Sequence, residues 1–274
     1  MPVIDVNGLP MGYELTGSGD PVVLVAGTGY AGATWSPRLV EPLAERHAVL
    51  TFDHRGTGVT PPTAERFSTR LFATDAIALM DALGLPAAHV VGHSMGGRVA
   101  QWMALDRPER VRSLVLAATG PGQWDGGSPV QRGIPMHTAL AMIEHGYEGY
   151  MREHIPATFF TPEFVASDPD VVHWLVRAFW DSRPSLESYL RHVVARQEHQ
   201  TADGLADISR PSLVLIGDRD RHQGGTGVHW EQSQALLAAV PGAVLEVIPD
   251  ASHGYFWQVP ELSAGILLDW AAAH

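Results

Sequence analysis

Three residue types that together perform nucleophilic catalysis occur in this chain in the order serine, aspartate, histidine. Gly92, Ser94 and Gly96 form the pattern Gly-x-Ser-x-Gly. A serine hydroxyl is a poor nucleophile at neutral pH, so it needs a histidine as a base and a carboxylate that orients the histidine. Downstream, Asp220 ends the segment Gly-Asp-Arg-Asp, and His253 ends the segment Pro-Asp-Ala-Ser-His. These residues predict a Ser94–His253–Asp220 catalytic triad.

The serine pattern lies at a predicted junction between a strand and a helix. The apolar run 88–91 precedes it, and apolar residues at helical spacing, such as Val99 and Met103, follow it. A serine on so sharp a turn adopts a strained backbone conformation, and the flanking glycines keep side chains from colliding with neighbouring backbone. The helix also directs its N–H groups towards the site where negative charge develops. A serine that merely caps an ordinary helix would not need glycine on both sides.

Buried parallel strands are predicted to position these residues. Apolar runs with little polar alternation are typical of strands covered by helices on both faces. The predicted strands span 21–25, 48–52, 88–91, 113–116, 212–217 and 243–248; helices are expected over 36–47, 69–83 and 227–240 and from residue 259, and a hairpin around 7–8. Asp220 and His253 each follow the carboxyl end of such a strand, where open α/β sheets hold their ligands. We therefore expect an α/β fold with a mostly parallel central sheet.

The strand rhythm stops between residues 122 and 204. That segment has helical spacing and many aromatic side chains, which predict an inserted helical cap over an apolar pocket. Residues 1–121 and 205–274 are then the two parts of the α/β core, and 122–204 is the cap.

Outside the cap, nearly the whole sequence resembles the α/β-hydrolase superfamily. The matching segments are 92–97 at the serine, 53–58 after a strand, 217–220 at the acid and 249–253 at the base. The resemblance implies an α/β-hydrolase fold with Ser94 as nucleophile, His253 as base, Asp220 as acid, and the Met95 N–H as half of the oxyanion hole. The second half falls at the Thr28 N–H, in a glycine-rich loop that lacks the family's usual His-Gly. Small esterases and enol-lactone hydrolases are the nearest members, since their oxyanion loops also tolerate that loss.

Other residues near these motifs leave alternatives open. Asp218 lies two residues before Asp220 and competes for the role of acid, as does Asp125 after an earlier strand. Asp53 and Arg55 are expected, by resemblance, to brace a glycine turn rather than to catalyse. The loop 221–227 replaces a short proline-containing link that is common in the family.

The composition excludes several other chemistries. The chain has 274 residues, a formal net charge of −12, no cysteine and no lysine, so thiol nucleophiles, thiolate zinc sites and Schiff bases are ruled out. The excess of acidic residues argues against a nucleic-acid partner and weighs weakly against strongly anionic substrates. The histidines of the cap lack metal-ligand spacing, and Gln223 stands where a calcium loop needs glycine, so no cofactor or metal is expected. We expect no membrane segment, a cytoplasmic location and a small-molecule substrate, and leave a homodimer open.

Taken together, the residues predict a serine hydrolase that cleaves an ester or lactone of a small, largely apolar substrate through an acyl-enzyme. The first alternative is a carbon–carbon hydrolase of β-diketones or ring-cleavage products, although such enzymes commonly carry tryptophan where this chain has Gly254. The second is a small-molecule binder on the same fold without turnover. The absence of lysine disfavours a plant-type hydroxynitrile lyase, and Ser94 stands where dehalogenases and epoxide hydrolases have aspartate.

Overall fold

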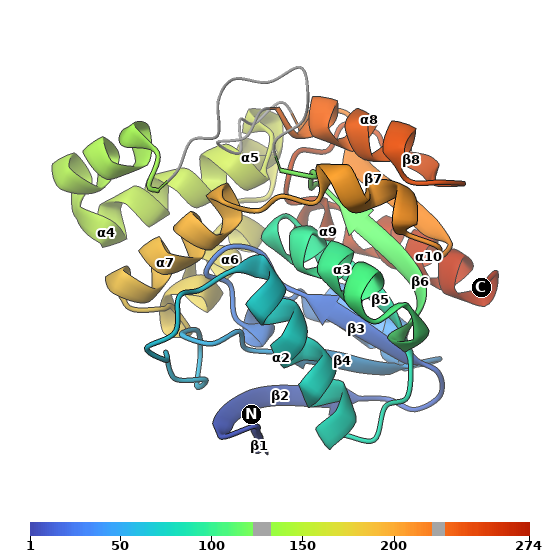
Figure 1. Cartoon of the computed structure of the whole chain (residues 1–274). Coiled ribbons are helices and arrows are strands. Elements are labelled where there is room, and N and C mark those ends of the chain that lie inside the picture. The colour runs from blue at the N-terminus through green and yellow to red at the C-terminus, as the bar shows by residue number, and fades with distance from the viewer. Residues whose placement is uncertain (123–132, 221–227) are drawn as a thin grey trace.

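A mixed eight-stranded sheet forms the centre of the computed structural model, which describes residues 1–122, 133–220 and 228–274 (Figure 1). The strand order is β1-β2-β4-β3-β5-β6-β7-β8, antiparallel from β1 to β4 and parallel from β4 onwards. The strands are β1 (Val3–Val6), β2 (Leu9–Thr16), β3 (Pro21–Val25), β4 (Ala48–Phe52), β5 (Ala88–His93), β6 (Val111–Ala117), β7 (Ser212–Gly217) and β8 (Val244–Ile248). The predicted mostly parallel sheet and N-terminal hairpin are confirmed.

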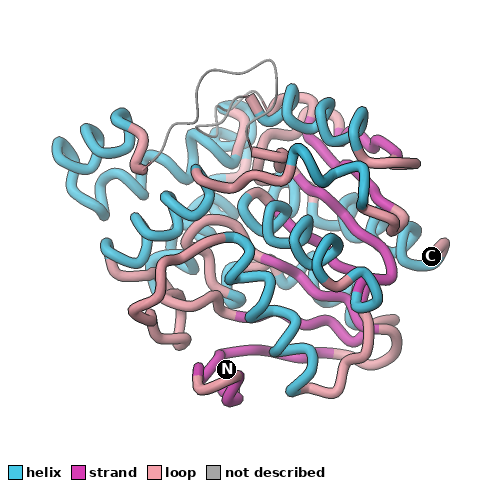
Figure 2. The backbone as a smooth tube through the Cα atoms, viewed as in Figure 1, coloured by secondary structure: helices cyan, strands magenta, loops and turns pink. Residues whose placement is uncertain are grey.

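Helices cover both faces of the sheet, as Figure 2 shows. Alternate residues of β3 enter different cores: Val22 and Leu24 belong to one hydrophobic cluster, Val23 and Val25 to the other, as the two-residue period of a strand requires. The first cluster includes side chains of α1 (Pro37–Ala44), α9 (Tyr255–Gln258) and α10 (Pro260–Ala272); the second includes those of α2 (Thr69–Ala82), α3 (Met95–Asp106) and α8 (His229–Ala239). Short 3-10 helices span Gly32–Thr34, Pro108–Arg110 and Ala202–Asp207.

Four further helices are inserted between β6 and β7 and gather on one side of the molecule (Figure 1). They are α4 (Met136–Phe159), α5 (Pro162–Ser167), α6 (Pro169–Asp181) and α7 (Leu186–Gln197). Gly146 has a φ of 71° and divides α4 at a kink. Side-chain caps from Thr161, Asp168 and Ser185 start the other three helices. The expected helical insertion is thus present, while the domain limits at 122 and 204 stay predictions.

Within the described parts of the chain, no helix is long and apolar enough to cross a membrane.

Candidate active site

The backbone at Ser94 has the strain that the Gly-x-Ser-x-Gly pattern predicts. Ser94 follows β5 and precedes α3, with φ 56° and ψ −118°, a conformation that a non-glycine residue rarely adopts. Its N–H donates to Ala117 O at 2.9 Å. A Cβ atom at Gly92 would collide with the backbone of Gly96, and one at Gly96 would collide with Val25 O. The two glycines are therefore needed for the close approach of α3 to β3 and β5.

His253 and Asp220 meet as the sequence predicts. Each follows a strand, β8 for His253 and β7 for Asp220, and both side chains are almost completely buried. His253 Nδ1 donates to Asp220 Oδ2 at 2.9 Å. Because that bond holds the proton on Nδ1, Nε2 of a neutral ring is free to accept one. Ser94 and His253 line the same cavity, so the histidine base and the serine face one space.

A second histidine, which the sequence did not single out, shares the acid. His229, the first residue of α8, donates from Nδ1 to Asp220 Oδ1 at 3.3 Å, and its ring stacks on His253 with centroids 4.4 Å apart. Burial on its own raises the pKa of Asp220, but the two histidines outweigh it and hold that pKa well below its usual range. Burial lowers the pKa of His229, and Asp220 only partly offsets this. At neutral pH the acid is therefore ionised between two rings.

His93, the residue before the serine, makes a hydrogen bond to the backbone of the base. His93 Nε2 donates to the backbone carbonyl of His253 at 2.9 Å. Burial, followed by the electrostatic interaction with the His253 ring, lowers the pKa of His93 well below its ordinary value, so the His93 ring is neutral. His93 stands inside the serine motif, yet a motif match does not predict this bond to a residue 160 positions away.

The two expected oxyanion donors lie beside the serine. Met95 is the first residue of α3 and is fully buried, which puts its N–H at the positive end of the helix dipole. Thr28 follows β3, the strand next to β5, and lines the cavity with Ser94. Its Oγ1 is buried and has no hydrogen-bond partner among the described residues. The Thr28 loop thus offers both an amide and a hydroxyl, and the oxyanion role of either donor remains a prediction.

The cavity at the serine is small. It has a volume of about 30 Å³ and is lined by Gly27, Thr28, Tyr30, Ser94, Met151, His154, Thr158, Phe159, Tyr189, Arg196, His229 and His253. That is space for about one water molecule. Residues of α4 and α7 form much of the wall, and a substrate larger than a water molecule needs a wider cavity than this one.

Two contacts between cap and core are made by the residues on either side of His253. The N–H of Gly254 donates to Phe159 O at 2.6 Å, and a Cβ at Gly254 would lie 2.6 Å from that oxygen. The hydroxyl of Ser252 donates to Thr158 O at 3.3 Å. The end of α4 is thus attached to the loop that carries His253, and only glycine fits at position 254.

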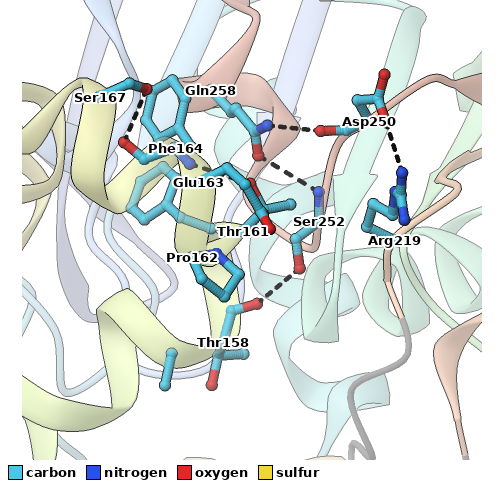
Figure 3. A pocket seen from close by; sticks show the side chains of 12 residues that line it. Thr158, Thr161, Pro162, Glu163, Phe164, Ser167, Arg219, Asp250, Ser252 and Gln258 are labelled. Carbon is cyan, nitrogen blue, oxygen red and sulfur yellow. Dashed lines mark hydrogen bonds and ion pairs between the residues drawn. The ribbon is translucent and has the colours of Figure 1, made fainter.

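A larger hollow of about 820 Å³ is lined by Thr158 and Ser252 among others (Figure 3). Thr158 lines both spaces, whereas Ser94 lines the small cavity and not this hollow. In the hollow, Arg219 pairs with Asp250 at 2.8 Å, and the Arg219 N–H donates to Ala251 O. The ion pair is exposed and adds little stability. These contacts join the loops that carry Asp220 and His253, so the hollow borders the catalytic loops without containing their reactive atoms.

The competing residues lie elsewhere. Asp218 Oδ1 is 3.7 Å from Arg219 Nε and accepts no hydrogen bond from the described residues, while Asp125 and Gln223 lie outside the described residues. Asp53 accepts from the backbone N–H groups of Gly32 and Val59, and Arg55 pairs with Asp75. The two hydrogen bonds to Asp53 connect the backbone at Gly32 and Val59, and Asp53 therefore braces these loops as the sequence analysis expects.

Comparisons with known proteins agree with this architecture. The family model described as "alpha/beta hydrolase fold" matches residues 20–260. A relative from Variovorax paradoxus (strain S110), named "Putative carbamate hydrolase RutD", is 40% identical over 269 residues and is matched over 96% of this chain and 97% of its own. The structure of Est816, described as an N-acyl homoserine lactone degrading enzyme, is 26% identical with a TM-score of 0.81, covering 98% of this chain and 99% of its own. The enol-lactonase from Burkholderia xenovorans LB400 shares the fold, with 22% identity and a TM-score of 0.84 over 99% of this chain and 100% of its own. The chain therefore belongs to the α/β-hydrolase family.

Proposed function

We propose that this hydrolase cleaves an ester or lactone by acyl transfer to Ser94. The observation that carries the proposal is the buried Asp220–His253 pair facing the same cavity as the strained serine. In the first step Ser94 Oγ attacks the carbonyl carbon while its proton passes to His253 Nε2. The oxyanion accepts from the N–H groups of Met95 and Thr28.

The second half of the reaction returns the proton. As the tetrahedral intermediate collapses, the alkoxide leaves with the proton from His253, and an acyl-enzyme remains. His253 then takes a proton from water while the water oxygen attacks the acyl carbon. The C–Oγ bond of the second tetrahedral intermediate breaks as His253 returns its proton to Ser94 Oγ, which releases the acid product and regenerates Ser94. Asp220 stays ionised throughout and stabilises the imidazolium, which its low pKa favours.

The apolar part of the lining favours a small substrate that carries a hydrocarbon group. Tyr30, Met151, Phe159 and Tyr189 supply most of the apolar wall. Carbamates also carry a carbonyl that a serine can attack, and the 40% identical relative is named for that substrate class, so a carbamate belongs among the test substrates. The alternative of carbon–carbon hydrolysis is disfavoured because Gly254 has no room for the tryptophan common in such enzymes.

A labelling experiment tests the nucleophile, and a substrate panel tests the bond. A fluorescent phosphonate is expected to label the wild-type protein and to leave Ser94→Ala unlabelled. Folded wild-type protein that takes no label would instead support binding without turnover. The second experiment compares kcat/KM for 4-nitrophenyl esters of increasing acyl length, lactones, a carbamate and a β-diketone. A higher kcat/KM for the diketone than for every other substrate would refute the proposal that an ester or lactone bond is cleaved.

A further inference from the structure

The cavity at Ser94 contains one strongly basic group that the hydrolytic mechanism does not use. Arg196, on α7 of the cap, lines the cavity together with Ser94 and His253. The residue is partly buried, and its Nε is fully buried with no hydrogen-bond partner among the described residues. A guanidinium has five N–H donors and stays charged at neutral pH. The guanidinium N–H donors of Arg196 are therefore in the same cavity as Ser94.

No carboxylate of the described chain neutralises Arg196. Burial lowers its pKa, and the groups that oppose this are Tyr189 and Tyr150. Burial raises the pKa of both tyrosines above the ordinary value, so their hydroxyls are neutral at pH 7. The arginine therefore carries a charge that no carboxylate of the described residues compensates, in a cavity partly lined by aromatic and aliphatic side chains, and this is unfavourable in the empty protein.

A second arginine adds to the positive potential. Arg98 on α3 donates from Nη1 to the backbone carbonyl of Arg196. Burial, followed by the charge of Arg196, lowers the pKa of Arg98 to about 9. Two cationic side chains are thus close enough to repel each other, and an anion in the cavity would relieve that repulsion.

We infer that Arg196 binds a carboxylate of the substrate, so that the ester or lactone cleaved at Ser94 carries a free acid group at its cap end. This inference rests on the proposed function, because it names the substrate class of the same site. A planar guanidinium recognises a carboxylate through two parallel N–H···O bonds. The apolar wall then contacts the hydrocarbon between the scissile carbonyl and that acid group.

The test uses matched substrates that differ by one methyl group. Mono-4-nitrophenyl esters of adipic, pimelic and suberic acid are compared with the same compounds methylated at the distal carboxylate. The wild-type protein is expected to prefer the free acid at one chain length. In Arg196→Gln, kcat/KM for that acid is expected to fall about 10- to 100-fold, as for the loss of charge-assisted hydrogen bonds, with little change for the methyl ester. Arg196→Lys keeps the charge but not the two parallel N–H donors. Its kcat/KM for the free acid is expected to lie between those of the wild type and Arg196→Gln.

Arg177→Gln is the matched control, since Arg177 is an exposed arginine of the cap and its loss changes the net charge equally. It is expected to leave the preference unchanged. Equal acid-to-ester ratios in the wild type and Arg196→Gln at every chain length would overturn the inference.

A binding measurement separates this inference from the proposed function. Calorimetric titration of the free-acid half-esters into Ser94→Ala requires no turnover, and Kd is expected to weaken about 10- to 100-fold when Arg196→Gln is added. Binding that depends on Arg196 without turnover by wild-type protein would refute the proposed hydrolysis alone. Turnover with unchanged Kd would refute the role of Arg196 alone.

Discussion

Replacing the buried acid tests the catalytic arrangement most directly, because the sequence offers two candidates two residues apart. In the transition state the protonated His253 lies against the Asp220 carboxylate, whose Oδ2 is 2.9 Å from Nδ1. Two unit charges about 4 Å apart at an effective dielectric constant of about 20 attract by about 4 kcal/mol. Each 1.4 kcal/mol is about a tenfold rate change. Asp220→Asn is therefore expected to lower kcat/KM about a thousandfold.

Asp218→Asn is the matched control. The Asp218 side chain is 38% exposed, and its Oδ1 lies 3.7 Å from Arg219 Nε, a weak contact whose loss is expected to change the rate by less than about threefold. The assay is hydrolysis of a 4-nitrophenyl ester together with the rate of phosphonate labelling, and circular dichroism confirms that both variants are folded. Wild-type rates in Asp220→Asn, or a large loss in Asp218→Asn, would refute the reasoning.

Two further predictions concern buried histidines. His229→Phe keeps a ring beside His253 but removes the bond to Asp220, so we expect kcat to fall about three- to tenfold; His229→Gln, which can still donate to the acid, is expected to retain more activity, and equal losses in the two variants would count against a positioning role. Burial lowers the pKa of His54 to about 3 and that of His192 to about 4, whereas an unfolded histidine titrates near about 6.5. Between about pH 6.5 and 4 the unfolded chain binds more protons than the folded chain, so the free energy of unfolding falls on acidification, by about 1.4 kcal/mol per pH unit for each histidine. Urea unfolding at several pH values is expected to show a shallower slope in His192→Gln, and an identical slope would contradict this origin.

The three residues of the expected triad could be located from sequence because of how parallel sheets are built. Carboxyl ends of adjacent parallel strands meet at one edge, so Ser94 after β5, Asp220 after β7 and His253 after β8 had to approach one another. Gly92 and Gly96 could also be interpreted from the sequence, because glycine on both sides of the serine indicates a close approach of neighbouring backbone.

His229 could not be placed in the same way. It lies nine residues after Asp220, and its contact with the acid depends on the path of the intervening loop and on the start of α8. A histidine at the start of a predicted helix shortly after the acid was the available signal. Nothing in the spacing distinguishes such a residue from an exposed helix terminus.

Arg196 shows why overall charge does not predict the polarity of a site. The formal charge of −12 weighs weakly against anionic substrates, but charges exposed to solvent are screened over about 8–10 Å at physiological salt. A buried guanidinium acts at contact distance and is screened much less. Tyr189, Val193 and Arg196 follow a spacing of four and seven residues, so they share one face of α7, and the first two are buried. An arginine in line with buried apolar residues on a cap helix is thus a better indicator of the polarity of the site than the composition of the whole chain.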